Sequence, residues 1–172
     1  MSGIIEVNTL RRDPAVTNIS INSPGFILST TKIRSNTRTA VSLAAIATLF
    51  SGTFVKLRSD TIIIATATIF GEAFNSGNCG VCLKIDGGTP NYGLQYQYDG
   101  GWSSTIQTTT ISGQCQFTGI AAGTRTISAG WHTFNGSASD RPFGFLNPSP
   151  STPGETRNQQ MVSSIIVYEV SV

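Results

Sequence analysis

The residues that could form a reactive centre are few, and the cysteines are the most suggestive of them. Cys79 and Cys82 are separated by two residues, as in redox pairs and in one half of a zinc site. A second cysteine pair is missing, and the only histidine, His132, is far away in the sequence. The residues Gly80–Ile85 follow a strand pattern, whereas a redox pair of the thioredoxin type begins a helix. We therefore interpret the cysteines as small buried hydrophobic residues, and a bridge from Cys115 to Cys79 or Cys82 stays open for an oxidising medium.

The acidic residues and hydroxyls do not form a catalytic set in the sequence. Glycoside hydrolysis needs two carboxylates about 5–10 Å apart in a cleft, but the nine acids are scattered and most flank predicted turns. A serine or cysteine nucleophile needs a histidine base, and His132 sits in a strand pattern that favours a structural role. Calcium would need a denser loop of oxygen ligands than the turns at Asp86 and Asp99 provide. We therefore predict a protein that is not an enzyme and has no catalytic residue, cofactor or metal.

Two segments are apolar on both faces of an extended strand. Residues 61–70 read Thr-Ile-Ile-Ile-Ala-Thr-Ala-Thr-Ile-Phe, and residues 165–170 read Ile-Ile-Val-Tyr-Glu-Val. Successive side chains of a strand point to opposite sides, so a strand in a lone two-layer sandwich needs only one apolar face. The second face predicts another partner, most simply a second copy of this chain. The sequence leaves open which face would make that contact.

The remaining elements predict an all-β antiparallel sandwich. Short alternating segments are separated by Gly and Pro turns, which is typical of sandwiches and barrels. The predicted strands include residues 53–57, 61–70, 81–85, 92–98, 104–111, 114–120, 124–128, 131–134 and 161–170. A short helix is the alternative over Ala40–Phe50, where Ala and Leu dominate. Residues 135–154 contain four prolines and predict a long loop. We divide the chain into an extended N-terminal arm, residues 1–25, and one domain, residues 26–172.

Composition and charge limit the classes of partner that this protein could bind. Only 12% of the 172 residues are charged, and the net charge of +2 is too small to favour nucleic acid. No apolar run is long enough to cross a bilayer, and the first residues lack a signal-peptide pattern, so we expect assembly in a cytoplasm and no membrane. A low-charge surface suits a protein that hides much of its exterior in an assembly. Basic residues crowd the first quarter, where they either border solvent or form an arm that grips a more acidic protein.

The order of elements resembles the jelly roll of the tumour necrosis factor and complement-like superfamily. The similar parts are the turn Leu57-Arg-Ser-Asp60 before a long apolar strand, the segment Ile120–Thr133, and the last strand, Ile165-Ile-Val-Tyr-Glu169. This resemblance of pattern covers roughly residues 30–172, and the N-terminal arm departs from it. Tailed bacteriophages use similar domains as capsid decoration proteins and as tips of tail fibres. The composition, rich in Ser, Thr and Gly, is similar to that viral branch.

The resemblance implies a jelly-roll trimer. Its expected role is a virion structural protein of a bacteriophage, a capsid decoration or cement protein that stabilises capsomer junctions. The residues that we assign to the trimer interface, spread over both strand faces, are Ile63, Ile64, Tyr96, Tyr98, Ile166 and Tyr168. The residues that we assign to contact with the major capsid protein are Ile4, Ile5, Arg11, Arg12 and Arg34.

The alternative role is a trimeric receptor-binding tip of a tail fibre or baseplate. Its possible receptor contacts are the aromatic residues Trp102, Trp131, Phe143 and Phe145, because aromatic faces stack on sugars. A tail-fibre protein usually carries a long shaft ahead of its tip, and this chain offers only a short arm, which favours decoration. A lectin-like bacterial trimer is a third option. The first two roles predict a location in the virion, on the capsid surface or in the tail, and none of the roles identifies the coat partner or the receptor.

Overall fold

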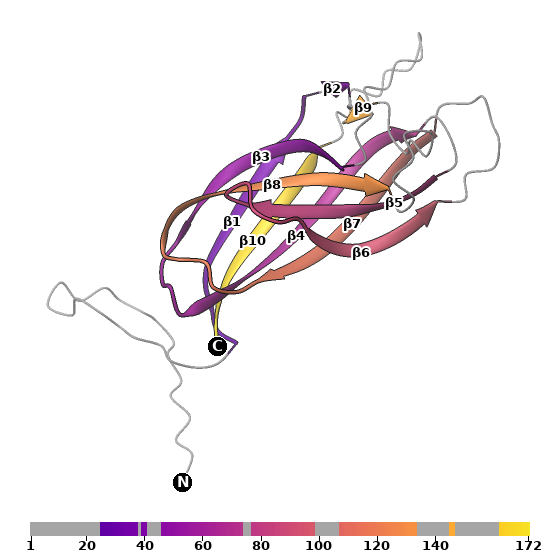
Figure 1. Cartoon of the computed structure of the whole chain (residues 1–172). Helices are drawn as coiled ribbons and strands as arrows, with labels where there is room; N and C mark the ends of the chain where they lie inside the picture. Colours follow the sequence, from indigo (N-terminus) through magenta and orange to yellow (C-terminus); the bar gives the residue numbers. More distant parts are fainter. Residues whose placement is uncertain are drawn as a thin grey trace, which may run out of the picture.

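The computed structural model describes residues 25–37, 39–40, 46–73, 77–98, 107–133, 145–146 and 162–172. These residues form strands and turns only, as Figure 1 shows. The strands are β1 (Ile27–Ser35), β2 (Thr39–Ala40), β3 (Ile46–Lys56), β4 (Thr61–Ala73), β5 (Gly77–Ile85), β6 (Asn91–Tyr98), β7 (Gln107–Phe117), β8 (Gly123–Thr133), β9 (Phe145–Leu146) and β10 (Ser163–Ser171).

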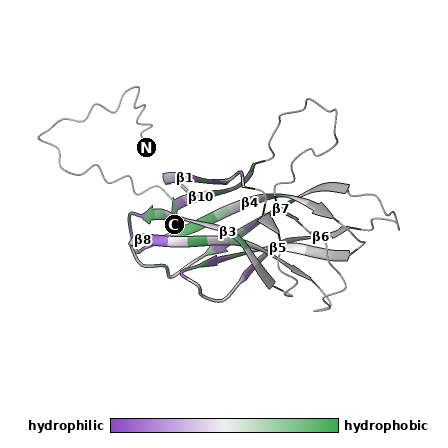
Figure 2. Cartoon of the chain, turned by 90° about the horizontal axis from the view of Figure 1, so that it is seen from above, coloured by the Kyte–Doolittle hydropathy of each residue, from purple (hydrophilic) through white to green (hydrophobic). Residues whose placement is uncertain are grey.

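The strands form two antiparallel sheets that pack face to face. The first sheet has the order β1-β10-β4-β9-β2, with β7 also paired to β4. The second sheet has the order β3-β8-β5-β6, and Figure 2 shows the two layers from above. Strands that are consecutive in the chain often lie in different sheets, as β3 and β4 do, which gives a jelly-roll sandwich. The predicted fold class is confirmed.

The core fills the space between the two sheets. On β4, Ile63, Ala65, Ala67 and Ile69 are fully buried and point inward. The second sheet meets them with buried side chains from β3, β5 and β8, namely Phe54, Val81, Leu83, Ile85, Ile127, Ala129 and Trp131. Small Ala65 and Ala67 lie between the larger Ile63 and Ile69, which leaves room for side chains of the second sheet. The face of β4 that packs the sandwich is therefore the one that carries Ile63.

The last strand lies inside the first sheet, as its two apolar faces predict. β10 pairs with β1 on one side and with β4 on the other. Its residues Ile165 and Val167 are buried toward the core, while Ile166 and Tyr168 on the opposite face are half-buried. A strand paired on both edges has its backbone groups satisfied, so only its outer side chains remain for other contacts.

Two boundaries and one alternative from the sequence are corrected. The sequence predicts separate strands over residues 104–111 and 114–120, and over residues 124–128 and 131–134, but β7 runs through Gly113 and β8 runs through Gly130. Gly113 pairs with Ala67, and Gly130 pairs with Cys82, so the continuous partner strands carry the ladder across both positions. The helix alternative is wrong for residues 46–50, because these begin β3. Pairing with neighbouring strands decides whether such short apolar segments form a strand or a helix.

Glycine permits a close approach of the two sheets at one position. An added Cβ at Gly52 on β3 would lie 2.6 Å from Cγ2 of Ile33 on β1. A separation below 3 Å forces one of the two groups to move. Gly52 therefore lets the edge strand of the first sheet settle onto the edge strand of the second.

Candidate interaction surface

One face of the first sheet is turned away from the core, and we call it the outer face. Its position follows from register, because residues directly opposite one another in an antiparallel pair share a face. Its described side chains are Thr30, Lys32 and Arg34 on β1, Ser164, Ile166 and Tyr168 on β10, Ile62, Ile64, Thr66, Thr68 and Phe70 on β4, and Ser112, Gln114 and Gln116 on β7.

The outer face has an apolar centre built from β10 and β4. Tyr168 lies directly opposite Ile64, and Ile166 lies opposite Thr66 in the next row. These side chains are half-buried within the single chain. None of the described residues forms a third layer over them, because the described strands all belong to the two sheets. Large aliphatic and aromatic side chains on such a face are typical of protein interfaces.

Polar side chains border this centre on both sides. The β1 side carries the exposed residues Lys32 and Arg34, and the β7 side carries the exposed amides Gln114 and Gln116. Between the centre and β7, the Ser112 hydroxyl donates a hydrogen bond to Thr68 Oγ1 at 3.1 Å. An apolar centre with a polar rim is the usual anatomy of a specific interface. This arrangement suits reversible or stable association with a protein.

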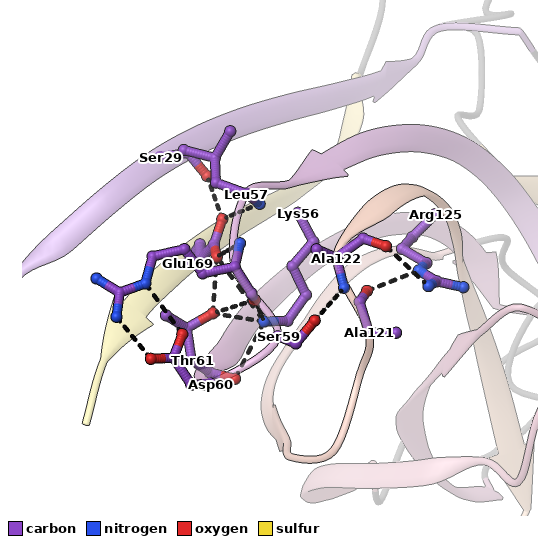
Figure 3. A network of polar contacts seen from close by, with 11 residues as sticks. Ser29, Lys56, Leu57, Ser59, Asp60, Thr61, Ala121, Ala122, Arg125 and Glu169 are labelled. Atoms are coloured by element: carbon purple, nitrogen blue, oxygen red, sulfur yellow. Dashed lines mark hydrogen bonds and ion pairs between the residues drawn. The ribbon is translucent and has the colours of Figure 1, made fainter. Parts of the chain in front are cut away.

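A buried polar network lies at one end of the core, where the chain crosses from β3 to β4 (Figure 3). Its centre is the carboxylate of Glu169 on β10, which is 1% exposed. Glu169 Oε2 accepts the Leu57 N–H at 2.7 Å, and Oε1 accepts the Arg58 N–H at 2.9 Å. The Thr61 hydroxyl lies 2.7 Å from Oε1. The carboxylate thus provides an acceptor for the amide donors of the crossing.

The cation of this network is Lys56, whose side chain is fully buried. Its Nζ lies 3.8 Å from Glu169 Oε1 and donates to the Thr61 carbonyl at 3.1 Å. It also donates to the Arg58 carbonyl and to Thr61 Oγ1. Burial raises the pKa of Glu169. A larger opposite effect comes from the hydrogen bonds that Leu57, Thr61 and Arg58 donate and from the charge of Lys56, so the pKa of Glu169 lies below its ordinary value. The Glu169 carboxylate is therefore ionised at neutral pH, and its role is structural.

The structure brings together three of the six residues predicted for the trimer interface. Ile64, Ile166 and Tyr168 are neighbours on the outer face. Ile63 is 0% exposed and belongs to the core, so it offers no surface to another chain and its assignment is corrected.

The two predicted tyrosines of the interface lie elsewhere. Tyr96 and Tyr98 belong to β6, the edge strand of the second sheet, so they are not on the sheet that carries the outer face. Their side chains are outside the described set, and their predicted role remains untested.

The other predicted contacts are mostly outside the described residues. Arg34 is described, and it lies exposed on the edge strand β1. Phe145 lies in β9, where the backbone pairs with Glu72 of β4, but its side chain is not described. The residues that fall outside the described ranges are Ile4, Ile5, Arg11, Arg12, Trp102 and Phe143. Trp131, also predicted for the receptor contact, is 2% exposed and belongs to the core, so it offers no surface to a receptor and its assignment is corrected.

The cysteines for which side chains are described behave as buried hydrophobic residues. Cys82 and Cys115 are free thiols, and both are buried. Burial raises the pKa of Cys82 and raises that of Cys115 to about 11, so both thiols are protonated and poorly nucleophilic near neutral pH. Among the described residues, no group of three His, Cys, Asp or Glu side chains could hold a metal ion. The same residues contain no apolar helix of membrane-spanning length.

Sequence reasoning missed Lys56 and Glu169, although strand phase contained a signal for both. Lys56 is in phase with buried Phe54, and Glu169 is in phase with buried Ile165 and Val167. A charged residue at a core position of an alternating strand predicts a buried partner of opposite charge. The pairing partner itself could not be found without the topology.

A scan against protein-family models gives no match, and a search of curated proteins gives none either. Solved structures with a similar fold include the infectious bursal disease virus VP2 subviral particle, at 12% identity and a TM-score of 0.44, covering 96% of this chain and 37% of that one. The sugar-binding EclA C-terminal domain matches at 15% identity and a TM-score of 0.32, covering 94% and 90%. The domain CBM35 from Cellvibrio japonicus Abf62 matches at 16% and 0.33, covering 84% and 86%.

These similar structures are viral capsid proteins and carbohydrate-binding domains. The chain spans little more than a third of the capsid protein chains that it matches. Similarities of this size describe a sandwich shape and do not assign a function, because one fold serves many functions. The functional argument therefore rests on the outer face.

Proposed function

We propose that this protein is a virion structural protein that associates with itself through the outer face, as a trimeric decoration protein on a capsid. The observation that carries the proposal is the apolar centre formed by Ile64, Ile166 and Tyr168 on a sheet face that no described strand covers. The predicted jelly-roll resemblance and the low fraction of charged residues support it.

The physical argument is the cost of leaving this centre in water. Fully burying an aliphatic or aromatic side chain contributes about 1.5–3 kcal/mol, and these side chains are already held in place by a sheet paired on both sides. Association therefore costs little additional conformational entropy, which favours a specific contact. Around a threefold axis, three outer faces would bury their centres against one another while the polar margins stay at the rim.

Analytical ultracentrifugation of the purified chain tests self-association. We expect a trimer for the wild type and a monomer for Ile166→Lys, because a lysine at the centre of the interface would be desolvated without a partner. The matched control is Thr53→Lys, an exposed position on β3 in the second sheet, which should leave the trimer intact. A wild-type monomer at micromolar concentration, or equal effects of the two substitutions, would contradict the proposal.

Electron cryomicroscopy of purified virions tests the place in the particle. Density for three copies over a junction of capsomers would support decoration, and density only at the tail would instead favour the receptor-binding tip. Of the residues predicted for the receptor contact, Trp131 is buried in the core and the side chains of the other three lie outside the described set, so no observation of the structure favours that alternative.

A further inference from the structure

The edge strand β1 presents a backbone edge that the described chain does not pair. β1 lies at the end of the first sheet and pairs only with β10 among the described strands. The pairing covers Ser29 to Arg34 without interruption, so this part of the strand contains no bulge. An unpaired edge without a bulge is a template on which another extended chain can add a strand.

Two cationic side chains of β1 lie on the outer face of the sheet. Lys32 and Arg34 are two residues apart, so both point to the outer face, and both are exposed. The described acidic side chains are engaged elsewhere: Asp60 with Arg58, Asp86 with Arg125 and Glu169 with Lys56. Neither cation therefore has an ionic partner within the described part of the chain.

A strand added to β1 would place its own side chains directly opposite these cations. Opposite charges facing each other across neighbouring strands stabilise the pairing, and like charges destabilise it. An incoming strand with acidic residues at two positions separated by one residue would present both carboxylates on the outer face. One such strand would pair with Lys32 and Arg34 together and complete the backbone ladder of the edge.

The chain itself cannot supply that strand. β1 contains no acidic residue, so a second copy of β1 would bring cations to cations. Elsewhere in the chain, the closest two acids, Glu6 and Asp13, are seven residues apart. The charge pattern thus requires a different polypeptide.

We infer that the edge of β1 accepts an extended segment of another protein that carries two acidic side chains at positions i and i+2. Within the proposed function this protein is the coat protein, and that identification alone rests on the proposed function. The strand addition is a property of the isolated domain. Arg34 was already predicted to contact the coat protein, and the inference now assigns it an acidic side chain as its partner.

The test is an NMR titration of the full chain with a synthetic peptide, Thr-Val-Glu-Val-Glu-Val-Thr. We expect chemical shift changes concentrated in the amides of residues 28–34. A peptide with lysines in place of both glutamates should bind about tenfold more weakly, because each attractive cross-strand pair becomes repulsive. Absence of shifts in β1 at millimolar peptide, or equal binding of the two peptides, would overturn the inference.

Two double variants with the same change in net charge separate a local contact from general electrostatics. Lys32→Gln with Arg34→Gln lowers the charge by two at the edge, and Gln114→Glu with Gln116→Glu lowers it by two at the opposite margin of the outer face. We expect about tenfold weaker binding for the first variant and less than a twofold change for the second. Equal losses would overturn the inference. Ultracentrifugation of the same samples reports self-association separately, so a monomer that binds the peptide would refute the proposed trimer alone.

Discussion

The two faces of β4 differ although they belong to one strand of thirteen residues. The inner face carries Ile63, Ala65, Ala67 and Ile69, all 0% exposed, and it packs against the second sheet. The outer face carries Ile64 and its neighbours, which are only half-buried within one chain. Apolar character on a strand thus has two separate consequences here. One face stabilises the fold of the single chain, and the other is available for association.

The largest expected effect on stability comes from Glu169, the buried carboxylate on β10. Glu169→Ala leaves the Lys56 ammonium buried without its counter-charge and leaves the N–H groups of Leu57 and Arg58 without an acceptor. We expect the free energy of unfolding to fall by about 3–5 kcal/mol, as measured by urea denaturation. The control is Asp60→Ala, which removes an exposed, solvent-screened pair with Arg58 and should cost far less than Glu169→Ala. Similar losses for both variants would show that the network does not hold the crossing.

Truncating one isoleucine on each face compares the faces directly. Ile63→Ala should lower the free energy of unfolding of the single chain by about 2–5 kcal/mol, because it opens a cavity in the core. Ile64→Ala should cost the single chain less than Ile63→Ala and should weaken self-association instead. Thermal denaturation at high dilution and sedimentation at high concentration separate the two readouts. If Ile64→Ala destabilised the dilute chain as much as Ile63→Ala, the distinction between the faces would fail.

The contact between the sheets at Gly52 should be sensitive to one added methyl group. We expect Gly52→Ala to cost about 1–3 kcal/mol, because the new Cβ would lie 2.6 Å from Ile33 Cγ2. Adding Ile33→Ala should recover part of that loss, since it removes the atom that collides. A double-mutant cycle by urea denaturation measures this coupling. Strictly additive losses would mean that β1 and β3 do not pack at this point.

The smallest effect is the pH dependence of stability that Glu169 contributes. Its pKa is lower in the folded chain than its ordinary value of about 4.3 in an unfolded one. The unfolded state therefore binds the proton more readily, so the stabilisation is complete above that ordinary value and is lost as pH falls through the lower folded value. The difference in unfolding free energy between wild type and Glu169→Gln should be constant from pH 7 to pH 5 and should shrink below pH 4. A difference that grows on acidification would have the wrong sign.

The sequence predicts the fold class because alternation and turns are local signals. The turn at Asp86 illustrates this, since Asp86 and Gly87 both have positive φ and the Gly88 N–H donates to the Ile85 carbonyl at 2.9 Å. The central position of β10 was also predictable from its two apolar faces. Strand lengths at Gly113 and Gly130 were not, because pairing with continuous neighbours overrides the local preference of glycine.

The candidate surface was only half predictable for a similar reason. Periodicity separates Ile63 from Ile64, but it does not state which of the two faces the second sheet. Nor does it show that Tyr168 lies beside Ile64 while Tyr96 belongs to the other sheet, since both facts depend on strand order. The partner of Lys56 lies more than a hundred residues away in sequence, so that pair needed the topology as well.

The central place of β10 also constrains how the protein is made. Its partners, β1 and β4, are synthesised long before it, and Phe26 and Ser171 exchange backbone and hydroxyl hydrogen bonds across a separation of 145 residues. The first sheet cannot close during translation until β10 has left the ribosome, so β1 and the edge of β4 that pairs with β10 stay unpaired until then. Contacts of such long sequence separation slow folding and expose aggregation-prone strands. We expect the nascent chain to depend on chaperones until that final strand is inserted.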